Sequence, residues 1–269
     1  MVTNNQQIKA EEAFSRQSSI FDALEDGNKI LQWMRVRVRN HLLSQLKPGS
    51  RILELNAGTG LDAVYLAEHG FKVHATDVSD GMVMQLEQKV KSQNIANAFT
   101  IQKCSYTELY KIEQEPFDYI FSNFGGLNCI PDLGAVTKQF PGLLKPGGKV
   151  TFVLMPAICP WEILLAFKGN FKTAFRRLKK GGTPSNIEGL YFDSFYFTPK
   201  TAIKSFGRNF KKIKLEGLAS ISPPPYLDWF PDRLPRIYKV LTNIDTALCT
   251  TWPFNSWADH FILTMQYMP

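Results

Sequence analysis

The residues with the clearest chemical potential stand in the segment RILELNAGTG, at positions 51–60. Its near-continuous apolar start is typical of a buried parallel strand, and residues 61–68 have the pattern of a helix. A strand, a glycine-rich turn and a helix together form the phosphate- or nucleotide-binding corner of a doubly wound α/β fold. Because Gly58 and Gly60 have no Cβ, a ligand can approach the backbone there and the turn can adopt positive φ.

Two common nucleotide motifs do not fit this turn. A dinucleotide fingerprint needs three glycines, but Asn56 stands in place of the first and position 63 is alanine. A P-loop needs Gly-Lys-Ser/Thr, which is absent. The segment instead resembles motif I of the class I S-adenosylmethionine-dependent methyltransferases, in which an acid precedes Gly or Asn and two further glycines at alternate positions. The matching positions are Glu54, Asn56, Gly58 and Gly60.

A second acid follows at the spacing that this resemblance requires. Residues 71–76 form the next expected strand, which ends at Asp77. In the resemblance, Asp77 accepts hydrogen bonds from both ribose hydroxyls of the cofactor, while Val78 and Met82 pack on the faces of adenine. The alternative is that Asp77 is only a cap or turn acid, next to Ser79 or Asp80 as the N-cap of the following helix.

The third expected strand, at residues 98–102, leads into a departure from the family pattern. Many relatives have an aspartate here that accepts the adenine amine, whereas this chain has Lys103, Cys104 and Ser105. The backbone amide or hydroxyl of Ser105 could still meet the ring nitrogens.

The fourth expected strand, at residues 117–122, runs into Asn123-Phe124-Gly125-Gly126. Ligands of open α/β sheets bind at the carboxyl ends of the strands, where this segment lies. The resemblance implies that Asn123 holds the amine of the cofactor through its carbonyls, and the two glycines leave room for substrate. The segment is not the Asp/Asn-Pro-Pro-Tyr/Phe tetrad of amino-directed nucleic-acid methyltransferases, which argues against base methylation. Leu-Lys-Pro-Gly-Gly at 144–148 precedes a fifth strand and is frequent in class I enzymes.

An N-terminal helical segment is expected to cover the cofactor. Residues 14–46 have a helical pattern, and residues 1–13 are expected to be frayed. In the resemblance, Phe21 and Arg35 lie near the methionine end of the cofactor, where an arginine can pair with its carboxylate. The alternative is a docking helix with a solvated arginine stripe. The cofactor site implied by the resemblance consists of Glu54, Asn56, Ala57, Gly58, Gly60, Asp77, Val78, Met82, Cys104, Ser105, Asn123, Phe124, Arg35 and Phe21.

The expected fold is a Rossmann-like seven-stranded α/β sheet with strand order 3-2-1-4-5-7-6. Residues 211–222 and 259–267 supply the last two strands, and the last one runs antiparallel. The predicted domains are a helical arm at 1–48, a cofactor-binding core at 49–155, 191–222 and 259–269, and substrate-cap insertions at 156–190 and 223–258.

The two insertions are rich in Trp, Tyr and Phe, which suits a flat or apolar organic substrate. The alternative is that these aromatic residues form only the core of the cap. Residues 171–180 are expected to form a basic helix that carries Phe171, Phe175 and Leu178 on one face. That helix has three interpretations: a solvated face, a weak contact with a membrane surface, or contact with an anionic substrate.

The implied reaction is methyl transfer from a sulfonium to a nucleophile on the substrate, and some acceptors need a base. Of the four histidines, His41, His69 and His74 are placed on helices or within a strand. His260 begins the antiparallel strand and is the candidate catalytic residue on the substrate rim; the alternative is a core or edge histidine. No set of acids and histidines has the spacing of a metal site, so no metal is expected.

Composition sets broad limits on these interpretations. The chain has 269 residues, a net charge of +7 and four separated cysteines, which we interpret as free thiols of a reducing cytosol. The N-terminus has no apolar signal region, and no run of about 18 apolar residues is present. The cysteines and the lack of an apolar signal region predict a cytoplasmic protein. The resemblance implies S-adenosyl-L-homocysteine as the product, and the sequence leaves open whether the protein is a monomer or a homodimer.

Three functional hypotheses remain. The first is an enzyme that methylates a small molecule such as a natural product, a quinone or a lipid-like acceptor. The second is a methyltransferase of RNA or protein, suggested by the positive charge, although a nucleic-acid partner is not favoured. The third is a non-catalytic module that binds S-adenosylmethionine.

Overall fold

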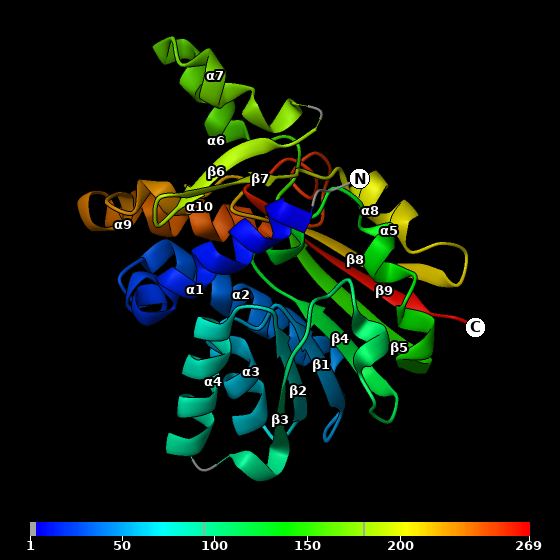
Figure 1. The fold of residues 1–269 in the computed structure, drawn as a ribbon. Helices are drawn as coiled ribbons and strands as arrows, with labels where there is room; N and C mark the ends of the chain where they lie inside the picture. The colour runs from blue at the N-terminus through cyan, green and yellow to red at the C-terminus, as the bar shows by residue number, and fades with distance from the viewer. Residues whose placement is uncertain (1–3, 94, 180) are drawn as a thin grey trace.

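The computed structural model describes residues 4–93, 95–179 and 181–269, and its centre is one seven-stranded sheet (Figure 1). The strand order is β3-β2-β1-β4-β5-β9-β8, and β9 runs antiparallel to both of its neighbours. The predicted Rossmann-like fold and strand order are therefore confirmed. The strands are β1 Arg51–Leu55, β2 Lys72–Asp77, β3 Phe99–Lys103, β4 Phe117–Ser122, β5 Leu144–Leu154, β8 Phe210–Leu218 and β9 His260–Tyr267.

Both faces of the sheet are buried, which explains the near-continuous apolar strands. Alternate residues of β1 pack into different cores: Ile52 faces the core that includes Leu42 and Leu86, while Leu53 faces the core that includes Phe140. Helices therefore cover the sheet on both sides (Figure 1). Their bounds are α1 Asn4–Asp26, α2 Lys29–Gln45, α3 Leu61–Glu68, α4 Asp80–Ser92, α5 Gly134–Thr137, α6 Pro160–Ile163, α7 Phe171–Ala174, α8 Pro199–Ser205, α9 Phe230–Arg233 and α10 Pro235–Leu248.

The N-terminal arm differs from its prediction in two ways. The single expected helix is divided in two, because Asn28 acts as N-cap of α2 and accepts hydrogen bonds from the amides of Ile30 and Leu31. The segment expected to be frayed is helical from Asn4, because Ala10 and Ala13 pack on a hairpin from the first insertion.

That hairpin consists of β6 Thr183–Ile187 and β7 Leu190–Ser194, which form a separate two-stranded sheet. Its two-residue turn has positive φ at Glu188 and Gly189, which matches the twist of paired strands. The predicted core boundary at residue 191 therefore needs correction, since residues 190–194 pair within the insertion rather than with the large sheet.

The predicted basic helix at 171–180 is also shorter than expected. It consists of α7 and a 3₁₀ turn at Arg176–Leu178. Arg177 is buried and donates hydrogen bonds to Glu162 and Asp259, both at 2.8 Å. Because a buried charge needs such partners, this ion pair anchors the insertion to the start of β9.

A second buried acid predicts how stability changes with pH. Glu216 on β8 contacts His41 and Lys214. Burial would raise the pKa of this carboxyl, but the hydrogen bonds and charges of those two partners lower it from 4.5 to about 2. A lowered folded-state pKa stabilises the fold above the unfolded pKa, so this contribution is lost as the pH falls from 4.5 towards about 2.

We therefore expect Glu216→Gln to be less stable than the wild type at neutral pH and to lose less stability below pH 4.5. Urea unfolding measured across this pH range checks the difference in slope. Glu68→Gln, at an exposed position of α3, is the control and should follow the wild type. Equal slopes for Glu216→Gln and the wild type would contradict the assignment.

Candidate functional site

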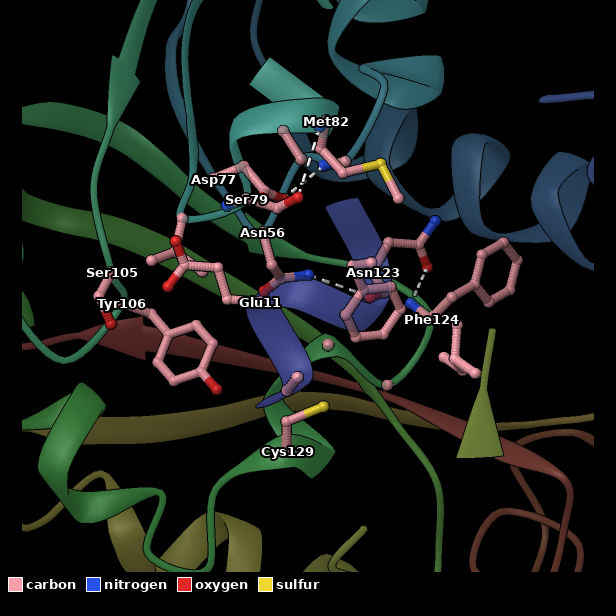
Figure 2. A pocket seen from close by; sticks show the side chains of 18 of the residues that line it. Glu11, Asn56, Asp77, Ser79, Met82, Ser105, Tyr106, Asn123, Phe124 and Cys129 are labelled. Carbon is pink, nitrogen blue, oxygen red and sulfur yellow. Dashed lines mark hydrogen bonds between the residues drawn. The ribbon is translucent and has the colours of Figure 1, made fainter. Parts of the chain in front are cut away.

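A cavity of about 690 Å³ lies over the carboxyl ends of β1, β2 and β4, with α1 across it (Figures 1 and 2). This is the edge at which open α/β sheets bind ligands, and the volume suits a nucleoside-sized ligand with room beside it. The predicted cofactor residues that line the cavity are Phe21, Arg35, Glu54, Asn56, Ala57, Gly58, Asp77, Val78, Met82, Ser105, Asn123 and Phe124.

The turn after β1 is fixed by the side chain of Asn56. Its Oδ1 accepts a hydrogen bond from the Ser122 hydroxyl at 2.8 Å. Its Nδ2 donates to the Asn123 carbonyl at 3.4 Å (Figure 2). A Cβ on Gly126 would lie 2.1 Å from that Nδ2 atom. Asn56 therefore links the β1 turn to the β4 loop, and Gly126 has to be glycine to make space for this link.

Asp77 holds the opposite side of the same turn. Its carboxylate accepts hydrogen bonds from the amides of Gly58 at 2.8 Å and Ser79 at 2.9 Å. Burial raises the pKa of this carboxyl, and the backbone hydrogen bonds limit the rise. The acid thus sits beside the glycine turn at the end of β2, where a ribose diol could reach it.

Two predicted cofactor residues lie outside the residues that line the cavity. Gly60 is needed for packing, because it has φ of +82° and its Cβ would lie 2.1 Å from Leu86. Cys104 points into the core around Leu109, and Ser105 takes the lining position beside it. The direct cofactor contacts predicted for Gly60 and Cys104 are corrected accordingly.

Charged side chains crowd the end of the cavity near α2. Arg35 lines the cavity and forms ion pairs with Asp62 and Glu25. Burial alone would raise the pKa of Asp62, but Arg35 and Arg39 hold it below its ordinary value. The Arg35 charge is thus already balanced inside the protein. A direct pairing with the cofactor carboxylate stays a prediction.

Glu54 is the buried acid of this end. Its side chain is 2% exposed, and Oε2 has no hydrogen-bond partner among the described residues. Burial raises the pKa of Glu54 well above its ordinary value, and the charge of Asp62 raises it further. Such a carboxyl group is suited to meet a donor supplied by a ligand.

The structure corrects the position of His260, the candidate catalytic residue. The strand β9 begins at the predicted edge, but His260 is not among the residues that line the cavity. Its ring lies 5.7 Å from the ring of Phe124, which does line the cavity, and its Nδ1 lies 2.8 Å from Asp259. His260 therefore packs edge-on against Phe124 and is not part of the cavity wall; a catalytic role for it stays a prediction that the cavity lining does not support.

The remaining walls of the cavity come mainly from α1 and the β6–β7 hairpin, with Cys129 and Met155 from the segments after β4 and β5. The sequence predicts a substrate cap at residues 156–190 but does not identify the wall residues as part of a site. They are mainly apolar with a few amides and hydroxyls. The residues are Gln7, Ile8, Ala10, Phe14, Cys129, Met155, Ser185, Asn186, Ile187, Phe192 and Ser194. The aromatic, strand-like pattern at 190–197 was the available signal, but nothing in it indicated which side would face the cavity.

The second insertion does not cap the cavity. No residue of 223–258 is among those that line it in the described part of the chain. This insertion contacts the N-terminal arm instead, where Asn28 donates to the Pro225 carbonyl and Arg37 donates to Thr246. The cap prediction is corrected for this segment.

Comparison with known proteins agrees with the fold and the cavity. Residues 52–148 match the family described as "Methyltransferase domain". Residues 52–148 therefore form a methyltransferase domain, and the fold and the relatives support a class I S-adenosylmethionine-dependent methyltransferase, a family whose cofactor is S-adenosylmethionine. The four cysteines are free, and the described residues contain no helix long and apolar enough to cross a membrane.

Two of the proteins that resemble this chain in sequence are a demethylmenaquinone methyltransferase of Bacillus mycoides and an S-adenosyl-L-methionine-dependent Diels-Alderase of Talaromyces variabilis. The first is 31% identical over 54% of this chain and 62% of the relative. The second is 31% identical over 40% of this chain and 37% of the relative. The chain thus spans less than two thirds of the length of these relatives. An S-adenosylmethionine-dependent methyltransferase structure from Mesorhizobium loti has a TM-score of 0.55 at 16% identity, covering 84% of this chain and 96% of that one, which shows the shared fold.

Proposed function

We propose that the protein transfers the methyl group of S-adenosylmethionine to a small, largely apolar organic acceptor. One observation carries this proposal: the cavity extends from the Asp77 side of the sheet into an apolar space between α1 and the hairpin. The first part suits the cofactor of the family, and the second part suits an acceptor beside it. The named relatives act on, or are named for, small organic molecules, which supports the same class.

In this proposal the cofactor lies along the turn after β1. Asp77 accepts hydrogen bonds from the ribose, Val78 and Met82 pack on adenine, and the Asn123 carbonyl and Glu54 face the amine at the methionine end. These roles are supported by the place of each side chain around the cavity and by the match of residues 52–148 to the family.

The protein contributes orientation and exclusion of water. S-adenosylmethionine supplies an electrophilic methyl group on a sulfonium, so the chain has to align an acceptor atom with it. Tyr106 lines the cavity and burial raises the pKa of its hydroxyl further above neutral pH, so this group is available as a neutral hydrogen-bond donor to the acceptor. The described residues that line the cavity include no histidine. Acceptors are therefore favoured whose reacting atom needs no base at the site, because it carries no proton or has already lost it in solution.

An acceptor of RNA or protein fits the cavity less well, because α1 and the hairpin pack on each other across it. The non-catalytic binding module remains the second candidate. Cys104 and Ser105 stand where relatives have an aspartate, and His260 does not face the cavity. Incubation with methyl-labelled cofactor separates the two candidates, since only an enzyme transfers the label.

We expect Ile187→Trp to abolish methyl transfer while cofactor binding persists, because the larger side chain fills the acceptor part of the cavity. The protein is incubated with labelled cofactor and a cell metabolite extract, and cofactor affinity is measured by calorimetry. Leu190→Trp is the matched control, because Leu190 pairs with Ile187 in the hairpin but does not line the cavity. If no wild-type product carries label, or Ile187→Trp methylates normally, the proposed acceptor site is wrong.

A further inference from the structure

The segment between β5 and the hairpin exposes an unusual number of large apolar side chains. Phe167 is 89% exposed and Phe171 is 62% exposed. Leu164, Phe175 and Leu178 are also exposed, and the five positions recur every three or four residues. We call residues 164–179 the projecting arm, since α7 stands away from the sheet at one end of the molecule (Figure 1).

The charge of the projecting arm has one sign. Residues 163–187 contain six Lys or Arg and no Asp or Glu. Arg176 and Arg177 bind the buried Glu162, which fixes the base of the arm on the core. Lys168, Lys172 and Lys179 are exposed, and none of them forms an ion pair with another described residue. The arm therefore presents phenylalanine and lysine together, without a compensating acid.

We propose that the projecting arm docks the protein on the surface of a membrane that contains anionic lipids. Phenylalanine and leucine side chains enter the interface, and the lysines bind lipid phosphates. Lysine is depleted in protein–protein interfaces, whereas lysine beside aromatic residues is typical of interfacial membrane segments. An anionic bilayer can therefore bind both the apolar side chains and the lysines of this surface, which a protein partner would do less well.

Docking through this arm would also position the cavity. The arm ends at Lys179, and β6 of the hairpin that lines the acceptor part begins at Thr183. An apolar acceptor could then pass from the bilayer towards the hairpin. This consequence rests on the proposed function, whereas the docking itself does not.

Co-sedimentation with vesicles tests the proposal. We expect the full chain to sediment with vesicles of phosphatidylcholine and phosphatidylglycerol, and much less with phosphatidylcholine alone or at high salt. Charge reversal of Lys168, Lys172 and Lys179 to Glu should weaken partitioning by roughly a hundredfold or more. The double variant Phe167→Ser, Phe171→Ser should lose binding while keeping the wild-type circular dichroism spectrum.

Charge reversal of Lys200, Lys204 and Lys211 is the matched control, because these exposed lysines belong to α8 and β8 and lie outside the arm. Equal loss in this control, or no sedimentation of the wild type, would overturn the proposal. Sedimentation velocity without lipid provides a further check: dissociation of a wild-type dimer by the phenylalanine variant would assign the arm to contact between two copies instead.

A second inference concerns the missing acid at Cys104. Glu11 of α1 lines the cavity, and its side chain extends towards the side where Asp77 and Ser105 lie (Figure 2). Lys103 holds it there: its Nζ lies 3.6 Å from Glu11 Oε1 and 2.7 Å from Asp80. Glu11, from the N-terminal helix α1, thus reaches the region in which the family resemblance expects adenine.

We infer that Glu11 accepts a hydrogen bond from the exocyclic amine of adenine, in place of the aspartate that the β3 loop does not have. The inference rests on the proposed mode of cofactor binding. A carboxylate acceptor prefers an amino group and disfavours a carbonyl oxygen at the same ring position. The N-terminal helix would then recognise the base directly as well as cover it.

Calorimetry with S-adenosylhomocysteine and S-inosylhomocysteine tests this role, because the two ligands differ in the group that replaces the amine. We expect the wild type to prefer the adenosyl ligand, and Glu11→Ala to weaken that ligand roughly tenfold while strengthening the inosyl ligand, because the repulsion between the carboxylate and the carbonyl oxygen is removed. Glu12→Ala, at the neighbouring position outside the cavity, is the control. Equal effects on both ligands would overturn the role of Glu11, whereas failure of both to bind the wild type would overturn the proposed function itself.

Discussion

Asp77→Ala should weaken the binding of S-adenosylhomocysteine by roughly a hundredfold or more, because the proposed mode of binding loses two charge-assisted hydrogen bonds to the ribose. The same carboxylate accepts bonds from the amides of Gly58 and Ser79, so the substitution also loosens the glycine turn. Both effects act in the same direction. Titration calorimetry with the purified variant measures the loss.

The control for this experiment is Glu87→Ala. Glu87 is exposed on α4 and does not line the cavity, so its removal should leave the affinity almost unchanged. Circular dichroism should show both variants folded. Wild-type affinity in folded Asp77→Ala protein would show that the ribose is not held by this acid.

Gly217→Ala is expected to lower the melting temperature by roughly 10 °C. The Cβ of residue 217 would lie 1.8 Å from the Phe254 carbonyl oxygen, which is a backbone atom and cannot rotate away. Gly217 also donates its amide to the Cys249 carbonyl at 2.7 Å. The loop after α10 would therefore have to leave the sheet to accommodate one methyl group.

Scanning calorimetry compares this variant with Gly142→Ala. Gly142 has no atom within 4 Å of its virtual Cβ, so the alanine there should be nearly neutral. If Gly217→Ala has the same melting temperature as Gly142→Ala, the loop that contains Phe254 tolerates displacement. The second insertion would then not be fixed to β8 at this point.

The parts of the site that were predictable are those encoded within a few residues. Asp77 and Asn123 follow buried strands directly, and parallel strands end at the same edge, so their proximity follows from topology. Gly60 shows the limit of a motif, because its lack of Cβ serves packing on Leu86. The sequence motif alone does not reveal whether its glycine contacts a ligand or packs against a neighbouring helix.

The parts that were missed depend on contacts distant in sequence. Strand topology brought His260 to the correct edge but did not show that Phe124, and not His260, would line the cavity. The second insertion is held by Arg37 and Asn28, more than a hundred residues away in the chain. The wall of the proposed acceptor part of the cavity depends on the contact between Phe14 of α1 and Phe192 of the hairpin. No local sequence pattern predicts that contact.

The attachment of α1 has a consequence for turnover. Its middle is joined to α4 through Ser15, which accepts a bond from the Gly81 amide at 2.9 Å, while Gln6 near its start binds Asp193 on the hairpin. The helix is therefore fixed on both sides of the cavity, to the core at Ser15 and to the hairpin at Gln6. Exchange of a bound nucleoside on the hairpin side would require the Gln6–Asp193 contact and the packing of Phe14 on Phe192 to break, whereas Ser15 could stay bound. The strength of these few contacts would then set how readily the site reloads.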